Sequence, residues 1–316
     1  MAAGANGFAG EGYRHHKLLR PFGHTFLRCT PVSKTTTFPP REGNIPMRED
    51  GITPKEFSPK CILPNLEFKH LPLSLRMFIR GYMLNAVGLS GPGAKALLEM
   101  GIWQKIEENH FLSFMSVATT PEERLDELKK FVQLLMLHLP DFRARIGLQM
   151  NYSCPNVGLD PSLLVDEAIA GLNVASELDI PLMPKFNLLA LPKAVAKICE
   201  NRHCHAICFP NTVPFGKLPD RIDWKKLFGS DVSPLAEFGG GGLSGAPLMH
   251  LTKEWLEDAR HAGVRKHINA SCGLGPRDVR TLYYAGADSV FLSSISTLRF
   301  WRMKSTIREA HLLFGD

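Results

Sequence analysis

Long apolar runs are absent from this 316-residue sequence, and none approaches the roughly 18 residues that a membrane-spanning helix needs. A secretory leader is also absent, and the seven cysteines stand at uneven spacings, which is typical of free thiols in a reducing compartment. We therefore expect a soluble, cytoplasmic protein without a membrane partner.

A strong charge bias is missing as well. The net charge is +6, and the lysines and arginines are scattered apart from short groups such as residues 14–17. This pattern predicts no nucleic-acid partner, although a local positive site for an anionic ligand is compatible with it.

Several familiar catalytic and metal-binding patterns are missing too. We find no paired carboxylates, no Ser-His-Asp order, and no Gly-x-Gly-x-x-Gly after a first strand. The cysteines and histidines between 199 and 208 match no zinc or iron-sulfur spacing, so packing explains them better than a metal does.

A regular alternation of strand and helix patterns fills most of the chain and predicts a parallel sheet. The expected fold class is α/β, a (β/α)8 TIM barrel of parallel strands; an open doubly wound sheet is the alternative. The sequence predicts a truncated first strand with residues 1–4 as its tail, so another segment has to fill the gap. Residues 38–91 form an irregular insertion with short hairpin strands after the second strand. The predicted strands are 25–32, 111–117, 146–152, 181–186, 205–209, 267–270 and 289–292, and the predicted helices are 94–100, 121–138, 161–178, 192–199, 252–262, 276–285 and one from about 297.

The loop at residues 151–156, Asn-Tyr-Ser-Cys-Pro-Asn, follows directly on an apolar strand. Barrel active sites lie at the carboxyl ends of strands, so this loop is the first candidate site. Its two carboxamides can hydrogen-bond a flat imide or amide ligand, and the Cys154 thiol can serve as a general base if its surroundings favour the thiolate. A buried cysteine in a Pro-Asn turn is the plainer interpretation.

A glycine-rich stretch at residues 238–245 precedes the last two strand-helix units. Backbone amides without side chains can surround a phosphate, and barrels commonly bind one at this place. A flexible lid is the alternative interpretation of the same glycines.

Ordered motifs along the chain resemble dihydroorotate dehydrogenases of the soluble, cysteine-containing class 1 type. The resemblance rests on Ser-Lys-Thr-Thr-Thr at 33–37 with Arg-Glu-Gly-Asn at 41–44, Met-Leu-Asn-Ala-Val-Gly-Leu at 83–89 with Pro-Gly at 92–93, Asn-x-Ser-Cys-Pro-Asn at 151–156, Asn-Thr at 211–212 and Gly-Gly-Leu-Ser-Gly at 241–245.

The resemblance implies a single FMN-binding barrel domain over residues 1–316 that oxidises dihydroorotate to orotate in pyrimidine biosynthesis, with 38–91 forming part of the substrate site. It implies that Cys154 removes the C5 proton while the C6 hydride passes to the flavin. The substrate residues would be Asn85, Asn151, Asn156, Asn211, Thr212 and Lys34. The flavin residues would be Gly4, Lys34, Lys185, Ser244, Gly245, Cys272, Gly273, Ser293 and Ser294.

Two departures from the family pattern concern the flavin site. Cys272-Gly273-Leu274 replaces the usual Gly-Gly-Ile, and the turn after it looks one residue short. Family chains also run about a strand further at the amino end, to an Asn-Ala-Ser-Gly motif where this chain has Met-Ala-Ala-Gly at 1–4.

Three functions stay open at this point. A related flavin enzyme acting on uracil-like rings generally has His where this chain has Asn156, which favours dihydroorotate. The departures motivate the third hypothesis, an inactive barrel with a binding or assembly role. The electron acceptor is either fumarate or NAD through an FAD and iron-sulfur partner subunit, and a homodimer is expected.

Overall fold

The computed structural model describes residues 1–63, 81–152, 163–271 and 273–315. Its larger sheet has six strands, and every neighbouring pair in it is parallel. The order is β10, β9, β6, β5, β4, β3, with bounds His110–Phe114 (β3), Ile146–Asn151 (β4), Leu182–Lys185 (β5), Ala206–Phe209 (β6), His267–Ser271 (β9) and Ser289–Phe291 (β10).

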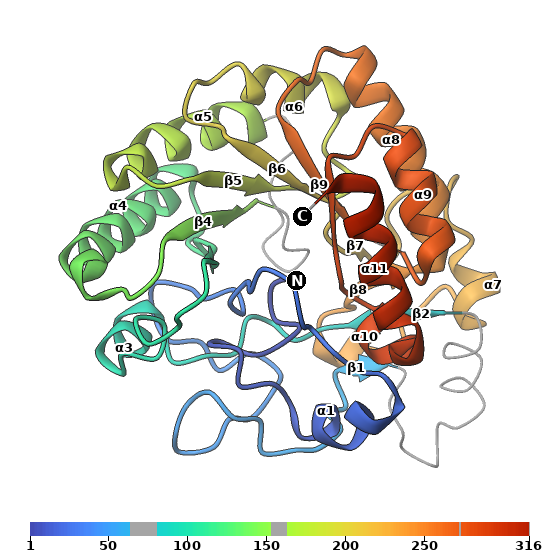
Figure 1. Cartoon of the computed structure of the whole chain (residues 1–316), viewed down its shortest axis with the longest axis horizontal. Coiled ribbons are helices and arrows are strands. Elements are labelled where there is room, and N and C mark those ends of the chain that lie inside the picture. The colour runs from blue at the N-terminus through green and yellow to red at the C-terminus, as the bar shows by residue number, and fades with distance from the viewer. Residues whose placement is uncertain (64–80, 153–162, 272, 316) are drawn as a thin grey trace.

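Helices follow these strands and cover the outer face of the sheet in an arc (Figure 1). This arrangement confirms the predicted α/β class with parallel strands and forms half of a barrel. The helices of the arc are Ala94–Glu99 (α3), Pro121–His138 (α4), Leu164–Ala175 (α5), Pro192–Cys199 (α6), Met249–His261 (α8), Pro276–Tyr284 (α9), Ile295–Leu298 (α10) and Met303–Phe314 (α11).

Local sequence explains the best-defined elements. Thr120 Oγ1 accepts a hydrogen bond from Glu123 N, and the Glu123 carboxylate accepts one from Thr120 N. Pro121 occupies the first turn, so α4 begins at its capping residues. All six residues of β4 are buried, as expected for a parallel strand covered on both faces.

The predicted strand over residues 25–32 is wrong. Arg28 has a left-handed backbone (φ 66°) and Leu27 is 76% exposed, so the chain turns before Pro31 instead of extending. Two isolated parallel bridges, Val32 to Phe111 and Thr36 to Phe114, bring this part of the chain alongside β3. Residues 32–36 therefore occupy the edge beside β3.

The gap expected from the truncated first strand is filled by the first residues of the chain. Ala2 N donates to Leu292 O at 2.8 Å, just after β10, and Lys34 N donates to Gly7 O at 2.8 Å. This segment turns back on itself through a bridge between Gly4 and Gly7 instead of forming a strand. It nevertheless contacts both edges that a missing strand would leave open.

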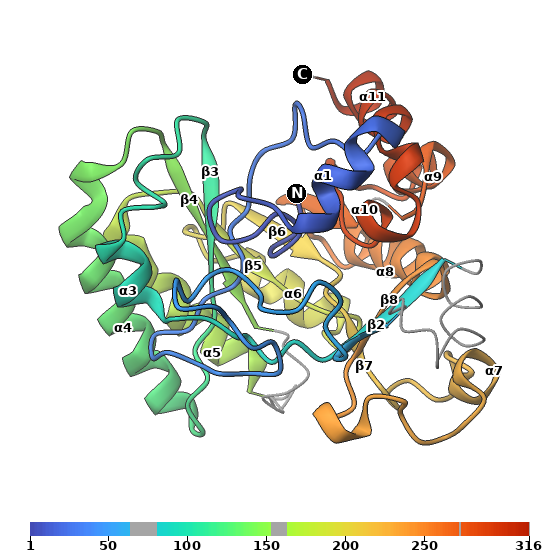
Figure 2. The ribbon, with the colours of Figure 1, turned by 90° about the horizontal axis from the view of Figure 1, so that it is seen from below.

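A second, antiparallel sheet lies beside the parallel strands, with β2 and β8 next to each other (Figure 2). The order is β1, β2, β8, β7, so the two strands of the predicted insertion, β1 and β2, pair with each other, and β2 also pairs with β8, which is far away in sequence. Residues 64–80 of the insertion lie outside the described residues. The strands are Ile62–Leu63 (β1), Tyr82–Asn85 (β2), Val213–Pro214 (β7) and Gly242–Gly245 (β8), and the remaining helical segments are Arg14–Leu19 (α1), Arg20–Phe22 (η1), Leu139–Asp141 (η3), Ser176–Leu178 (η4), Trp224–Phe228 (α7), Ala236–Phe238 (η5), Ala246–Leu248 (η6) and Phe300–Arg302 (η7).

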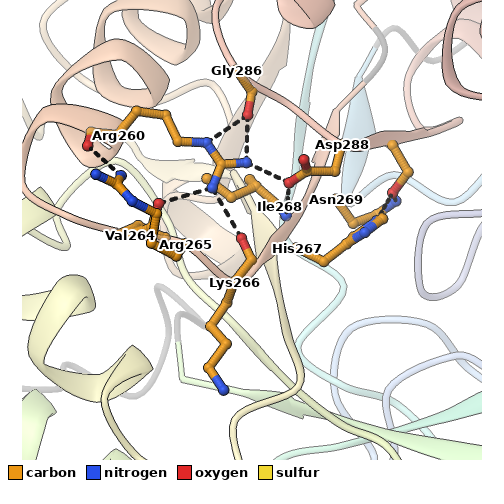
Figure 3. A network of polar contacts seen from close by, with 10 residues as sticks. Arg260, Val264, Arg265, Lys266, His267, Ile268, Asn269, Gly286 and Asp288 are labelled. Carbon is orange, nitrogen blue, oxygen red and sulfur yellow. Dashed lines mark hydrogen bonds and ion pairs between the residues drawn. The ribbon is translucent and has the colours of Figure 1, made fainter.

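The amino ends of β9 and β10 are joined by the guanidinium of Arg260, at the end of α8 (Figure 3). It donates to Gly286 O at 2.8 and 2.6 Å, to Val264 O at 2.9 Å and to Lys266 O at 3.0 Å, and it forms an ion pair with Asp288. One side chain thus satisfies three backbone carbonyls, which stabilises the loops at this end of the sheet.

Candidate active site at the carboxyl ends of the strands

Three predicted residues meet where β4, β5 and β6 end. Asn151 is the last residue of β4 and lies in register with Lys185, the last residue of β5. Asn211 follows β6, and its Nδ2 donates to Asn151 Oδ1 at 3.3 Å, while its backbone N donates to Phe186 O at 2.7 Å. Asn151 and Lys185 are both buried. The polar groups of this cluster therefore face one another at the predicted end of the sheet.

Lys34 and Gly4 are also neighbours, although the chain separates them by 30 residues. A Cβ built on Gly4 would lie 3.6 Å from Lys34 Cγ. Lys34 is 9% exposed; its ammonium donates to Ser90 O and lies 4.7 Å from the centre of the Phe8 ring. Burial lowers the pKa of Lys34 to about 7, against the opposing effect of Glu11.

Four serines form a hydroxyl cluster, with Ser244 in β8, Ser271 at the end of β9, and Ser293 and Ser294 after β10. Ser294 Oγ donates to Ser244 Oγ at 2.8 Å, and Ser271 and Ser293 share a hydrogen bond of 3.1 Å between their hydroxyls. Ser244, Ser293 and Ser294 are predicted flavin residues, and the structure brings them together. Ser271 completes the cluster.

The β2–β8 ladder connects the predicted substrate loop to this serine cluster. Asn85 pairs with Gly242, and its Nδ2 donates to Gly242 O at 3.4 Å, while Ser244 lies further along the same ladder. Gly245 has φ 106°, and a Cβ there would lie 2.4 Å from Gly81 O, so the close approach of the two strands requires glycine. Thr212 precedes β7, which pairs with the other edge of β8.

Two contacts link these groups into one region. Lys185 Nζ lies 6.0 Å from the centre of the Phe291 ring on β10, across the interior of the sheet. Ala2 N donates to Leu292 O, which places the Gly4 segment next to Ser293. The region therefore has a lysine from β5, a lysine from residues 32–36, and a group of hydroxyls between β8 and β10.

Three predicted residues, Cys154, Asn156 and Cys272, lie outside the described residues. Gly273 is described: it has φ 66°, and a Cβ there would lie 2.5 Å from Asp278 Cβ. Asp278 also accepts a hydrogen bond from Leu274 N at 2.7 Å, which fixes the turn before α9.

The sequence-based prediction missed Ser271, Ser90 and Cys208. Ser271 ends β9, so the strand-end rule that selected Asn151 and Lys185 would also have selected it. Cys208 lies in register with Lys185, and burial raises the pKa of its thiol to about 11. Ser90 contacts Lys34 only through long-range folding, which no local pattern signals.

Within the described ranges, no group of three His, Cys, Asp or Glu residues is arranged to hold a metal ion. The helices found there also include none that is long and apolar enough to cross a membrane.

The parallel sheet and its helices define an α/β protein whose six strands form half of a barrel, and in barrels of this class ligands bind at the carboxyl ends of the strands. Sequence similarity to named proteins indicates a more specific family within this class. The chain is similar to proteins named dihydroorotate dehydrogenase B (NAD(+)), catalytic subunit: it is 24% identical over 246 residues to that of Anoxybacillus flavithermus, covering 74% of this chain and 71% of the relative.

Two further relatives have the same name. The protein of Geobacillus sp. (strain WCH70) is 24% identical over 245 residues, and that of Geobacillus kaustophilus is 25% identical over 244 residues; each alignment covers 75% of this chain and 72% of the relative. These names confirm the predicted resemblance to class 1 dihydroorotate dehydrogenases, which are oxidoreductases.

No protein-family model matches the chain. Among solved structures, the tryptophan synthase α-subunit of Pyrococcus furiosus shows 11% identity and a TM-score of 0.29, over 71% of this chain and 94% of that one. That likeness is too low to support the fold assignment, which rests on the parallel sheet itself.

Proposed function

We propose that this protein is an FMN-dependent dihydroorotate dehydrogenase that oxidises dihydroorotate to orotate in pyrimidine biosynthesis. The observation that carries the proposal is the meeting of Asn151, Lys185 and Asn211 at the strand ends, and the separate pairing of Gly4 with Lys34 supports it. The shared name of three relatives supports it, as does the order of the sequence motifs.

The residues present fit a planar, phosphorylated ligand. Gly4 and Gly245 have no side chain. A Cβ on Gly4 would contact Lys34, and a Cβ on Gly245 would contact the opposite strand. The serine hydroxyls between β8 and β10 can donate to phosphate oxygens, as can the nearby backbone amides. FMN, when bound, supplies the acceptor for the hydride from C6 of the substrate.

The phosphate would be held by Ser244, Gly245, Gly273, Ser293 and Ser294, with Cys272 from the same loop. The ammonium groups of Lys34 and Lys185 would lie beside the ring. A buried cation near the flavin N1 and O2 favours negative charge there, so Lys185 would stabilise the reduced ring. Gly4 would leave room for the ring next to Lys34.

The substrate ring would be held by carboxamides, because a ring rich in C=O and N–H groups satisfies donors and acceptors that are costly to bury alone. We assign this role to Asn85, Asn151, Asn156, Asn211 and Thr212, and we assign the substrate carboxylate to Lys34.

Proton removal from C5 is assigned to Cys154. A thiolate is the form that accepts a proton, so the site must favour ionisation of this thiol when the substrate is bound. The proton leaves C5 as the hydride leaves C6, which converts the C5–C6 single bond of dihydroorotate into the double bond of orotate.

The electron acceptor and the assembly belong to the same proposal. The relatives are named as NAD(+)-dependent catalytic subunits, so we propose a partner subunit that passes electrons to NAD, and a homodimer of this chain within the complex. The seven cysteines, at uneven spacings, support a reducing, cytoplasmic location.

The test is the visible spectrum of the purified protein, followed by turnover with dihydroorotate or dihydrouracil and with NAD or fumarate as acceptor. We expect bound flavin and orotate formation from dihydroorotate alone. Turnover of dihydrouracil instead of dihydroorotate would indicate a flavin enzyme that acts on uracil-like rings. A protein that neither contains nor takes up FMN would favour the non-catalytic hypothesis.

A further inference from the structure

The first and last helices of the chain lie on the same side of the molecule, as Figure 2 shows for α1 and α11. Two contacts join the segments around them. A Cβ built on Gly23 would lie 3.6 Å from Trp301 Cα, and His311 Nε2 forms a hydrogen bond of 3.2 Å with Arg28 O. Residues 12–30 and 299–315 therefore form one surface, and we call their exposed side chains the α1–α11 face.

Large apolar side chains point to solvent on the α1–α11 face. Five of them are between 44% and 76% exposed, namely Leu18, Phe22, Leu27, Trp301 and Leu312. On α11, Lys304, Arg308 and Leu312 are all exposed and follow the helical repeat, so they share one side of the helix. Single exposed apolar residues are ordinary, whereas several on one surface indicate an interaction site.

The same face holds the positive charge of the protein. Residues 12–30 and 299–315 contain eight lysines and arginines and one acidic residue, so they carry +7 and the rest of the chain carries −1. Seven of the eight are exposed; the other, Arg299, lies 5.6 Å from the centre of the Trp301 ring. The acidic residue, Glu309, is paired with Arg280 of α9. An anionic surface is therefore the complement of this face.

Charge and apolar exposure together select the kind of partner. A second copy of the chain would bring two strongly positive faces together, which is repulsive. Nucleic acid would match the charge but would leave the exposed leucines without an apolar partner. An anionic bilayer matches both, because its headgroups attract basic side chains and its boundary with the acyl chains accepts Leu, Phe and Trp.

We propose that the α1–α11 face binds peripherally to the surface of an anionic membrane. The exposed leucines, Phe22 and Trp301 would lie at the boundary between headgroups and acyl chains. Peripheral binding requires no membrane-spanning helix; the sequence-based expectation of no membrane partner rested on the lack of long apolar runs. The face uses none of the residues of the candidate active site, so the proposal does not depend on the dihydroorotate chemistry.

The first experiment measures sedimentation of the native full-length protein with vesicles. One set is phosphatidylcholine alone, and the other is an equimolar mixture of phosphatidylcholine and phosphatidylglycerol. At low salt, binding to the mixed vesicles should be at least about tenfold tighter than to the neutral ones, because several basic residues face the anionic headgroups. Added salt should weaken it by screening.

Trp301 reports whether the face enters the lipid. It is 44% exposed, whereas the other three tryptophans of the chain, Trp103, Trp224 and Trp255, are buried. Binding to mixed vesicles should shift the fluorescence emission to shorter wavelength, and lipids brominated on their acyl chains should quench it. The variant Trp301→Phe should bind to within about twofold of wild type and lose both signals.

A matched pair of double variants locates the surface. Arg308→Glu combined with Leu312→Ser should weaken binding to mixed vesicles at least about tenfold, because it reverses a charge and removes an apolar contact. Lys129→Glu combined with Leu137→Ser makes the same change on α4, where both residues are exposed, and should stay within about twofold of wild type. Thermal melts check that each variant is folded.

Three results would overturn the proposal. The first is a protein that stays in the supernatant with both kinds of vesicle, which would leave an acidic protein surface as the candidate occupant. The second is an equal loss of binding in the two double variants. The third is binding to mixed vesicles without any change in the emission of Trp301, which would assign the contact to another surface.

Discussion

The two ends of the parallel sheet are built from similar residues for different purposes. At the amino end, the Arg260 guanidinium is saturated by three carbonyls and Asp288, and it lies against loops. At the carboxyl end, Lys34 is buried against an aromatic ring with its pKa lowered, and carboxamides face each other from neighbouring strands. Saturated polar groups stabilise a fold, whereas buried and perturbed groups indicate a binding site.

The largest contrast should come from cysteines at opposite ends. Cys154→Ala should retain FMN and slow flavin reduction by dihydroorotate at least about a hundredfold, because it removes the proposed base. Rapid-mixing absorbance measures the rate. Cys199→Ser, at the amino end, should change it by less than about twofold. Equal rates in Cys154→Ala and wild type would remove Cys154 from the mechanism.

A substitution at the amino end of the sheet should reduce the stability of the fold. Arg260→Ala should lower the free energy of unfolding by about 2–3 kcal/mol, because three backbone carbonyls lose their charged hydrogen-bond donor. The Michaelis constant for dihydroorotate should stay unchanged. Urea denaturation measures the difference. Arg265→Ala, which removes a single exposed bond to Arg260 O, is the control and should cost less than about 0.5 kcal/mol. A stable Arg260→Ala protein that had lost FMN would reverse the assignment of the two ends.

A carboxamide pair at each end permits a closer comparison. Asn211→Ala should reduce kcat/KM for dihydroorotate about tenfold, the scale of one hydrogen bond to the substrate ring. Asn201 Nδ2 donates to Asn173 Oδ1 at 2.9 Å near the amino end, so Asn201→Ala is the matched control. Steady-state kinetics should show no change there. Similar losses in both variants would mean that Asn211 acts through stability alone.

The smallest effect should be a pH dependence of anion binding. The pKa of Lys34 is about 7 in the folded protein, so the side chain loses its charge as the pH rises through that value. Affinity for the orotate carboxylate should therefore fall several-fold between about pH 6 and pH 8. Titration of flavin absorbance with orotate measures it. Lys34→Met should bind weakly with no such slope; an unchanged slope would place the titrating group elsewhere.

How far the sequence predicts this molecule depends on the range of the interactions. The helices Pro121–His138 and Pro192–Cys199 were predicted with their observed bounds, because each starts with proline and α4 has a local cap as well. The strands that end at Asn151 and Lys185 were predicted to end one residue later, at 152 and 186, because the apolar runs stop near polar residues there.

Features that depend on distant contacts were not predictable in the same way. The left-handed backbone of Arg28 prevents the predicted strand over 25–32. The position of residues 32–36 depends on their pairing with β3, which is distant in sequence. The Ser271 to Ser293 bond depends on the register between β9 and the end of β10, which no local pattern contains.

The central claim is that the carboxyl end of the sheet binds FMN and transfers a hydride from dihydroorotate to it. Anaerobic mixing of the FMN-loaded protein with dihydroorotate tests this most directly. We predict that the flavin absorbance bleaches and that orotate appears in equal amount. Flavin that stays oxidised with dihydroorotate, yet is reduced by dithionite, would contradict the account.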